Sequence, residues 1–452
     1  MNEDKRALLK QRLESGQIQL QPLTFPQREL WEASPVPVAD MANHICCVIE
    51  VRGKMPPEYA EAVLRQVVSR QEALRVSFLP GKDRPMQMIR EDCPPSFRFR
   101  ELSPAQARPE AVEEIARGIF SEPFDLLQGP LYRVELLSRA ADDHLLVFAI
   151  HHAIADGWSL GVFVQELGVA YLQRLRGVRE ALPPVPLTYS AWGAAERAWW
   201  QAAELEPRAA FWKTQLADRP RLWNSLEGPD TAAGAHLRLV SYFPPELAEA
   251  ARELARRSGA TLFSTLLAAF QIALSRWTGA SDILVGTPVA NRTRQAAKET
   301  MGYFAGIVPL RGQIDGARSF SATLRAMHQT TVDSFAHAMP FAELVRALGD
   351  TPAPGHNPVF EVRFALQNHP VPEVSLPALS AKLRMRSTGT ARFHLACEIT
   401  EEGDQLEVVW LFRSKVFPQA DVDNLGRMFQ AVLVRACQSP DDRIAALEAR
   451  MS

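Results

Sequence analysis

The side chains of this chain whose types and spacing could do chemistry are concentrated at residues 151–159, in the stretch HHAIADGWS. Two histidines stand side by side, an Asp-Gly pair follows, and a tryptophan and a serine complete the stretch. Imidazole has an ordinary pKa of about 6.5, so a histidine can accept a proton from an attacking amine or hydroxyl at neutral pH. Four interpretations fit these residue types: a base or positioning histidine, a metal site, a serine nucleophile, and two structural histidines.

The two histidines are expected to face opposite ways. The apolar run HLLVFAIHH (144–152) predicts a strand, and successive side chains of a strand point to opposite faces. One ring can then face a cleft while the other packs inward, so the pair is a poor chelator of one metal ion. His152 and Asp156 could still approach one ion across the turn, but no other cluster has metal-ligand spacing. We therefore expect no metal site.

A serine nucleophile is suggested by GWSLG (157–161), which matches the G-x-S-x-G pattern of the nucleophile elbow. An elbow places its serine directly at the end of a strand, whereas this strand is expected to end near His152. Ser159 suits the N-cap of a helix predicted over 160–175. Histidines lie further along the chain, so a serine hydrolase that uses Ser159 stays an alternative.

Base or positioning catalysis by one histidine is helped by the residues that follow it. Gly157 allows a tight turn, and the predicted helix directs free backbone N–H groups toward the same place. Those donors could stabilise a developing oxyanion. Asp156 lies in the turn itself, so we expect it to hold a distant arginine rather than to orient the imidazole.

The elements that must position this stretch alternate between helices and strands along the chain, which indicates an α/β fold. A polar helix is predicted at 1–20, and the proline-rich ALPPVPL (181–187) divides an N-terminal lobe, 21–180, from a C-terminal lobe, 181–452. The other predicted strands are 44–53, 131–138, 282–292, 303–311, 359–368, 393–400 and 405–412. The other predicted helices are 57–74, the Trp-rich stretch 192–212, 261–279, 318–335 and 418–437.

Composition excludes several classes of protein. Of the 452 residues, 47% are apolar and 23% charged, as in soluble globular proteins, and the formal net charge of −2 creates no field that recruits nucleic acid. No apolar run reaches the roughly 18 residues of a membrane span, and the charged N-terminus lacks a signal core. Five scattered cysteines form no CxxC pair. We expect a monomeric cytoplasmic protein that binds neither membranes nor nucleic acids.

The same stretch also carries a resemblance to a known family. HHAIADG is similar to the HHxxxDG motif of the condensation domains of nonribosomal peptide synthetases and of related acyltransferases, including chloramphenicol acetyltransferase. Further segments resemble the other motifs of this family, in the family's order, along nearly the whole chain. These segments are LTFPQRELW (23–31), RQEALRVSF (70–78), FDLLQGPLYR (124–133), YSAW (189–192), VGTPVANR (285–292), MGYFAGIVPLR (301–311), HAMPFAELV (337–345) and GHNPVFEVRF (355–364).

The resemblance implies two chloramphenicol-acetyltransferase-like lobes, arranged as a V-shaped pseudo-dimer with a central tunnel. By motif position, His152 would be the active-site histidine, as base or as positioner, and Gly157 would line the site. His151 and Asp156 would be structural, with Arg292 as the salt-bridge partner of Asp156. The walls of the tunnel would include Trp158 and, from the C-terminal lobe, Asn357.

The activity that the resemblance implies is acyl transfer. Carrier proteins would bring phosphopantetheine-tethered substrates to the tunnel, and the acceptor amine or hydroxyl would attack the donor thioester to form an amide or an ester. The enzyme would need no metal or cofactor of its own. The alternatives are an acyl-CoA-dependent O- or N-acyltransferase and, from another class, the serine hydrolase.

Departures from the family pattern put the substrate subclass in doubt. Gln71 replaces the usual His of the second motif, Ser190 and Ala191 replace the usual Asp-Phe, and 304–307 reads FAGI in place of FVNT. No adenylation motif and no carrier serine motif is present. We therefore expect either a free-standing condensation enzyme or an excised domain.

Overall fold

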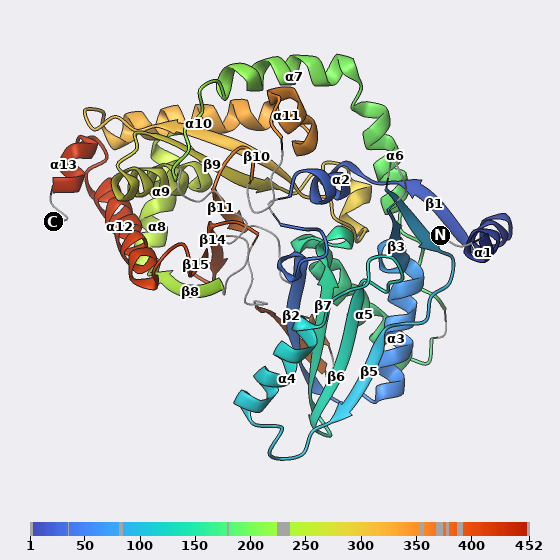
Figure 1. Cartoon of the computed structure of the whole chain (residues 1–452). Coiled ribbons are helices and arrows are strands. Elements are labelled where there is room, and N and C mark those ends of the chain that lie inside the picture. The colour runs from blue at the N-terminus through green and yellow to red at the C-terminus, as the bar shows by residue number, and fades with distance from the viewer. Residues whose placement is uncertain are drawn as a thin grey trace.

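The structure is a computed structural model that describes residues 3–34, 36–80, 85–178, 180–223, 236–351, 357–367, 374–376, 379–386 and 392–449. Two lobes meet at an angle, which gives the molecule the outline of an open V (Figure 1). Each lobe is built around a six-stranded mixed sheet with its own hydrophobic core. This is the two-lobed α/β architecture that the resemblance implied.

The sheet of the N-terminal lobe has β7 among its central strands. In spatial order its strands are β12 (Val374–Leu376), β13 (Leu379–Arg386), β2 (His44–Gly53), β7 (Asp143–His151), β6 (Tyr132–Ala140) and β5 (Phe97–Glu101). Only β5 and β6 pair in parallel. All residues of β7 except the first are buried, which explains its continuous apolar run. A small separate sheet contains β1 (Ile18–Pro22), β4 (Met86–Arg90) and β3 (Val76–Leu79).

The sheet of the C-terminal lobe has β11 between two parallel neighbours. Its spatial order is β10 (Gly306–Gln313), β9 (Asp282–Val289), β11 (Val362–Gln367), β14 (Leu395–Glu402), β15 (Gln405–Arg413) and β8 (His236–Phe243). The strands predicted at 282–292, 303–311, 359–368, 393–400 and 405–412 are confirmed in this sheet, with ends that differ by a few residues.

Several helices, such as α3 (Pro57–Arg70), pack against the core of their lobe through an apolar stripe. The helices are α1 (Glu3–Glu14), α2 (Phe25–Glu32), α3 (Pro57–Arg70), α4 (Pro109–Ser121), α5 (Gly157–Leu175), α6 (Tyr189–Trp199), α7 (Ala202–Gln215), α8 (Pro245–Arg257), α9 (Leu262–Thr278), α10 (Phe320–Ala336), α11 (Phe341–Leu348), α12 (Gln419–Gln438) and α13 (Ile444–Ala449). In α3 the buried residues recur at helical spacing: Ala60, Val63, Leu64, Val67 and Val68. The predicted helix 57–74 ends early, at Arg70, where a 3₁₀ turn, η2 (Glu72–Arg75), follows.

The length and apolar character of the described helices bear on whether any of them could span a membrane. None of them is by itself long and apolar enough to cross a bilayer. Only α8 and α9 taken together, with a bend of 107° between them, meet the length and composition required.

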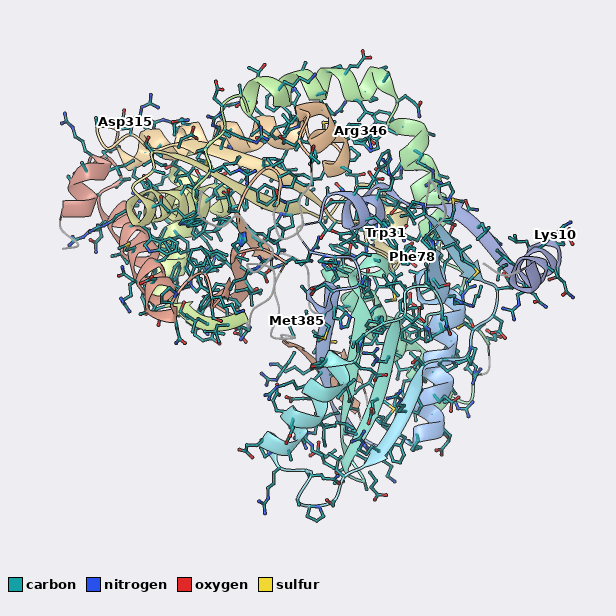
Figure 2. The ribbon with its side chains drawn as sticks, in the orientation of Figure 1. Lys10, Trp31, Phe78, Asp315, Arg346 and Met385 are labelled. Atoms are coloured by element: carbon teal, nitrogen blue, oxygen red, sulfur yellow. The ribbon has the colours of Figure 1, made fainter. Side chains whose placement is uncertain are left out.

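One segment of the C-terminal half joins the sheet of the other lobe. Residues 379–386 of β13 pair in antiparallel register with residues 46–53 of β2. Met385, on β13, accordingly lies beside the N-terminal lobe (Figure 2). The lobe boundaries at residues 20 and 180 stay a prediction, but the C-terminal half is not confined to one sheet.

Candidate active site

His151 ends β7 and is fully buried. Its Nε2 lies 2.8 Å from the carbonyl oxygen of Val38, and its Nδ1 accepts a hydrogen bond of 3.1 Å from the backbone N–H of Ala153. Burial lowers the pKa of this imidazole to about 3. Since Nδ1 must be unprotonated to accept from a backbone donor, the ring is held neutral and in one orientation.

His152 begins a 3₁₀ turn, η3 (His152–Ile154), and its ring has different surroundings. The ring centroid lies 4.7 Å from that of Tyr303, at an interplanar angle of 65°. Burial, together with the charge of Arg392, lowers the pKa of His152 well below its ordinary value. Its buried Nδ1 has no hydrogen-bond partner in any other described residue. The neutral ring therefore keeps an unused nitrogen at the junction of the lobes.

The two rings separate as expected, but for a different physical reason. The strand ends at His151 rather than at His152, so the turn, not strand alternation, directs the second ring away. The backbone contacts of both His151 ring nitrogens fit a structural histidine, and that role stays a prediction.

Asp156 closes the turn that follows. It is the N-cap of α5, and its Oδ1 accepts from the backbone N–H of Ser159 at 2.9 Å and from its hydroxyl at 2.8 Å. Its Oδ2 accepts from the backbone N–H of Phe304 at 3.2 Å. The prediction of Ser159 as N-cap is therefore wrong: α5 begins at Gly157, and Ser159 is the reciprocal member of a capping box.

Arg292 forms the expected ion pair with Asp156, at 2.9 Å between Nη2 and Oδ1. Its Nη1 also donates to the carbonyl oxygens of Ala297 and Thr300, each at 2.7 Å. The guanidinium carbon lies 3.8 Å from the ring centroid of Phe304. This buried arginine binds the turn of the N-terminal lobe to the loop that precedes β10.

The remaining predicted site residues lie nearby in the chain or in the opposite lobe. Gly157 is half-buried at the first position of α5. Trp158 is half-buried and donates from Nε1 to the carbonyl oxygen of Lys298 at 2.9 Å. Asn357 is buried, and its Oδ1 accepts from two backbone N–H groups, at 2.9 and 3.0 Å, within a turn before β11. The tunnel-wall roles of Trp158 and Asn357 stay predictions.

Ser159 lacks the surroundings of a nucleophile. It is fully buried, and its hydroxyl interacts with Asp156, Arg292 and the backbone of Gly302. None of these contacts is with a histidine, which a serine hydrolase would need as its base. Among the described residues no group of three or more His, Cys, Asp or Glu side chains could hold a metal ion.

Comparison with known proteins shows which family the chain belongs to. A family model described as "Condensation domain" matches residues 17–450. The chain belongs to the condensation-domain family. This condensation domain is 29% identical over 443 residues to a linear gramicidin synthase of Brevibacillus parabrevis. It is 31% identical over 435 residues to phosphinothricin tripeptide synthetase PhsB of Streptomyces viridochromogenes. Each match covers 94% of this chain, but only 8% and 36% of those relatives.

Solved structures share the fold. The SgcC5 protein of Streptomyces globisporus superposes with a TM-score of 0.78 and 23% identity, covering 93% of this chain and all of the other. The first condensation domain of the CDA synthetase gives 0.79 and 22%, covering 94% and 98%. At these identities the likeness concerns the fold alone.

The departures from the family pattern have structural partners in this condensation domain. Gln71 donates to the carboxylate of Glu166 and to the carbonyl oxygen of Glu299, and it accepts from the backbone N–H of Met301 at 2.8 Å. Ser190 donates from its backbone and its hydroxyl to the carboxylate of Glu72, at 2.8 and 2.7 Å. Both residues connect the second family motif, in the N-terminal lobe, to segments beyond residue 187.

Sequence reasoning missed Tyr303 and Arg392, which act on His152 directly, and Glu29, which acts on both of these residues through its charge. Glu29 had a detectable signal, because it lies four residues after buried Phe25 on α2 and places a carboxylate on the buried side of the helix. Tyr303 lies within MGYFAGIVPLR (301–311), a segment that resembles a family motif, but no role was predicted for it. Arg392 had no signal, since its place beside Tyr303 depends on the path of the chain into β14.

Proposed function

We propose that this condensation domain transfers an acyl or aminoacyl group from a carrier-protein thioester to an amine or hydroxyl acceptor, forming an amide or an ester. The observation that carries the proposal is the placement of His152. Within a family match that covers residues 17–450, its neutral ring lies against Tyr303 from the other half of the chain. A neutral imidazole at a lobe junction is able to accept a proton from, or hold in place, an incoming nucleophile.

The proposed reaction balances without a cofactor of the protein's own. The acceptor nitrogen or oxygen forms a bond to the thioester carbon, the carbon–sulfur bond breaks, and the acceptor proton ends on the phosphopantetheine thiol. His152 acts as base or as positioner of the nucleophile. The partners are therefore a loaded carrier protein and an acceptor, which is either carrier-bound or free.

A direct test is intact-protein mass spectrometry of a donor carrier loaded with a panel of acyl and aminoacyl groups, with amine and hydroxyl acceptors. His152→Ala should lower the rate of product formation by about 100-fold or more, the usual size of acid–base or positioning effects. His328→Ala, on the distant α10, is the matched control and should keep its activity. Product formation by His152→Ala at the wild-type rate, above the uncatalysed background, would contradict the proposal.

The same experiment distinguishes carrier-dependent transfer from the alternative, an acyl-CoA-dependent acyltransferase. The donor acyl group is supplied on coenzyme A instead of on the carrier, at equal concentration. Carrier-dependent transfer predicts a much lower rate with the CoA thioester. Equal or faster transfer from coenzyme A would assign the chain to the acyl-CoA-dependent enzymes.

A further inference from the structure

A phenol and a guanidinium lie close to His152, and a carboxylate, Glu29, lies close enough to both of them to act through its charge. Nη1 of Arg392 donates to the hydroxyl of Tyr303 at 3.5 Å, and the Tyr303 ring is the one that contacts His152. Glu29, on α2, is only 6% exposed, and it and Arg392 influence each other's pKa through their charges. None of these three residues takes part in the turn that Asp156 closes.

The helix that carries Glu29 is fixed from two sides. Trp31 of α2 packs against Phe78 of β3 with ring centroids 5.2 Å apart, and the two lie together in Figure 2. Arg28 pairs with Glu343 of α11 at 3.3 Å. Because α2 is anchored in both lobes, the Glu29 carboxylate has a defined place and is not a side chain that turns freely into solvent.

Arg392 differs from two other largely buried arginines of the chain. Arg292 contacts the carboxylate of Asp156, and Arg70 contacts that of Glu166. No such contact within 4.0 Å joins Arg392 to Glu29 or to any other carboxylate of the described residues. Its buried Nε also has no hydrogen-bond partner among them.

An arginine without a carboxylate partner is able to bind an anion strongly. A buried guanidinium with an unused donor is costly unless an anion binds it, and its planar fork matches a carboxylate with two parallel hydrogen bonds. Burial raises the pKa of Glu29 to about 7, so near neutral pH this carboxyl is a weak competitor for the arginine. Arg363, another cation near His152, is already bound to the carboxylate of Glu398.

We infer that Arg392 is a specificity-determining residue that binds a free carboxylate of a substrate beside His152, with the Tyr303 hydroxyl as a second donor. The substrate class is thus an acyl donor or an amine acceptor that carries a carboxylate in addition to its reacting group. This inference rests on the proposed function. In the fraction of molecules in which Glu29 is ionised, its charge opposes an incoming carboxylate.

The test compares substrates that differ only in charge. One pair is a carrier-bound aspartyl and asparaginyl acceptor, and the other is a carrier-bound succinyl and succinamoyl donor. The wild type should prefer the carboxylate member of one pair by at least tenfold in kcat/KM, and that pair identifies whether donor or acceptor is recognised. A site built for a hydrogen-bonding group discriminates strongly against an analogue that lacks it.

Substitution separates recognition from a structural role. In Arg392→Gln the loss with the carboxylate substrate should exceed the loss with its amide by at least tenfold, whereas Arg392→Lys should keep part of the preference. Glu29→Gln should increase the preference. A purely structural role would lower both members of a pair equally, and an unchanged ratio in Arg392→Gln would overturn the inference. Thermal melts verify that each variant is folded.

A binding measurement keeps the inference separate from the proposed function. Calorimetric titration with succinate and with its neutral diamide should show binding of succinate to the wild type that is at least tenfold weaker in Arg392→Gln. If the wild type forms no product with any substrate pair, the proposed function fails while this titration still decides the role of Arg392. Equal succinate affinity in the two proteins would overturn it.

Discussion

His151 and His152 are neighbours in the chain, yet their environments give them opposite chemical capacities. Both ring nitrogens of His151 lie within hydrogen-bond distance of the backbone, so its ring serves the structure and has no nitrogen left for a substrate. His152 has its ring against Tyr303 and a nitrogen without a partner in another described residue. Identical side chains thus differ through their hydrogen bonds and not through their type.

The buried state of His151 predicts a loss of stability in acid. Its folded-state pKa of about 3 lies below the ordinary 6.5, so the unfolded chain binds the proton more tightly in that window. The contribution of neutral, buried His151 to the free energy of unfolding is complete above pH 6.5. It is lost as the pH falls toward 3, by at most about 1.4 kcal/mol for each pH unit. Denaturant melts between pH 8 and 4 should show a shallower pH slope for His151→Asn than for the wild type. Equal slopes would contradict this assignment.

At the scale of single residues, the sequence predicts which residues have a role better than it predicts which residues surround them in the fold. The role proposed for His152 and the pairing of Asp156 with Arg292 followed from motif spacing and the family resemblance. The gathering of Glu29, Tyr303 and Arg392 did not, because residues 29, 303 and 392 meet only after both lobes have formed. No local pattern encodes a contact of that sequence separation.

The turn between β7 and α5 is the element that carries the site. Asp156 and Ser159 form a capping box that satisfies backbone N–H groups at the start of α5, and Arg292 neutralises the buried carboxylate. The sequence predicted this helix three residues too short, because Asp and Ser are both favoured N-caps and spacing alone does not decide between them. The short strands β1, β3 and β4 were not predicted, since runs of four or five residues give little periodic signal.

Removing the charge of Asp156 should therefore damage the fold rather than the chemistry alone. Asp156→Asn leaves Arg292 buried without its anion and is expected to lower the free energy of unfolding by about 3–5 kcal/mol. Glu61→Gln, which breaks the exposed pair with Arg65, is the control and should change it by less than about 1 kcal/mol. Chemical denaturation measures both. A variant at Asp156 that is fully stable but inactive would place this carboxylate in the reaction instead.

At the scale of the whole molecule, the connections between the two halves of the chain position the site. Beyond the pairing of β13 with β2, Tyr189 of α6 interacts through its hydroxyl with Thr24 at 2.7 Å and donates to the carbonyl oxygen of Tyr303 at 2.6 Å. The sequence predicted two lobes with a break near 181–187 but not these crossings. A strand that pairs in the opposite lobe has the same local pattern as one that pairs in its own.

Gln71 offers the sharpest test of this coupling. Its amide bonds to the backbone of Glu299 and of Met301, which is two positions before Tyr303, and to buried Glu166 of the N-terminal lobe. Gln71→Leu leaves a backbone donor, a backbone acceptor and a carboxylate without this partner. The expected cost is about 2–4 kcal/mol of unfolding free energy, accompanied by a loss of transfer activity as Tyr303 shifts from His152.

The control for Gln71→Leu is a glutamine that makes only a local contact. Gln329 is exposed on α10 and donates to Asp333 one helical turn away, so Gln329→Leu should change stability by less than about 0.5 kcal/mol. Thermal melts and transfer rates are measured for both variants. If Gln71→Leu keeps wild-type stability and activity, the two halves of the chain are held together by other contacts, and the amide that replaces the family's usual histidine has no part in placing Tyr303.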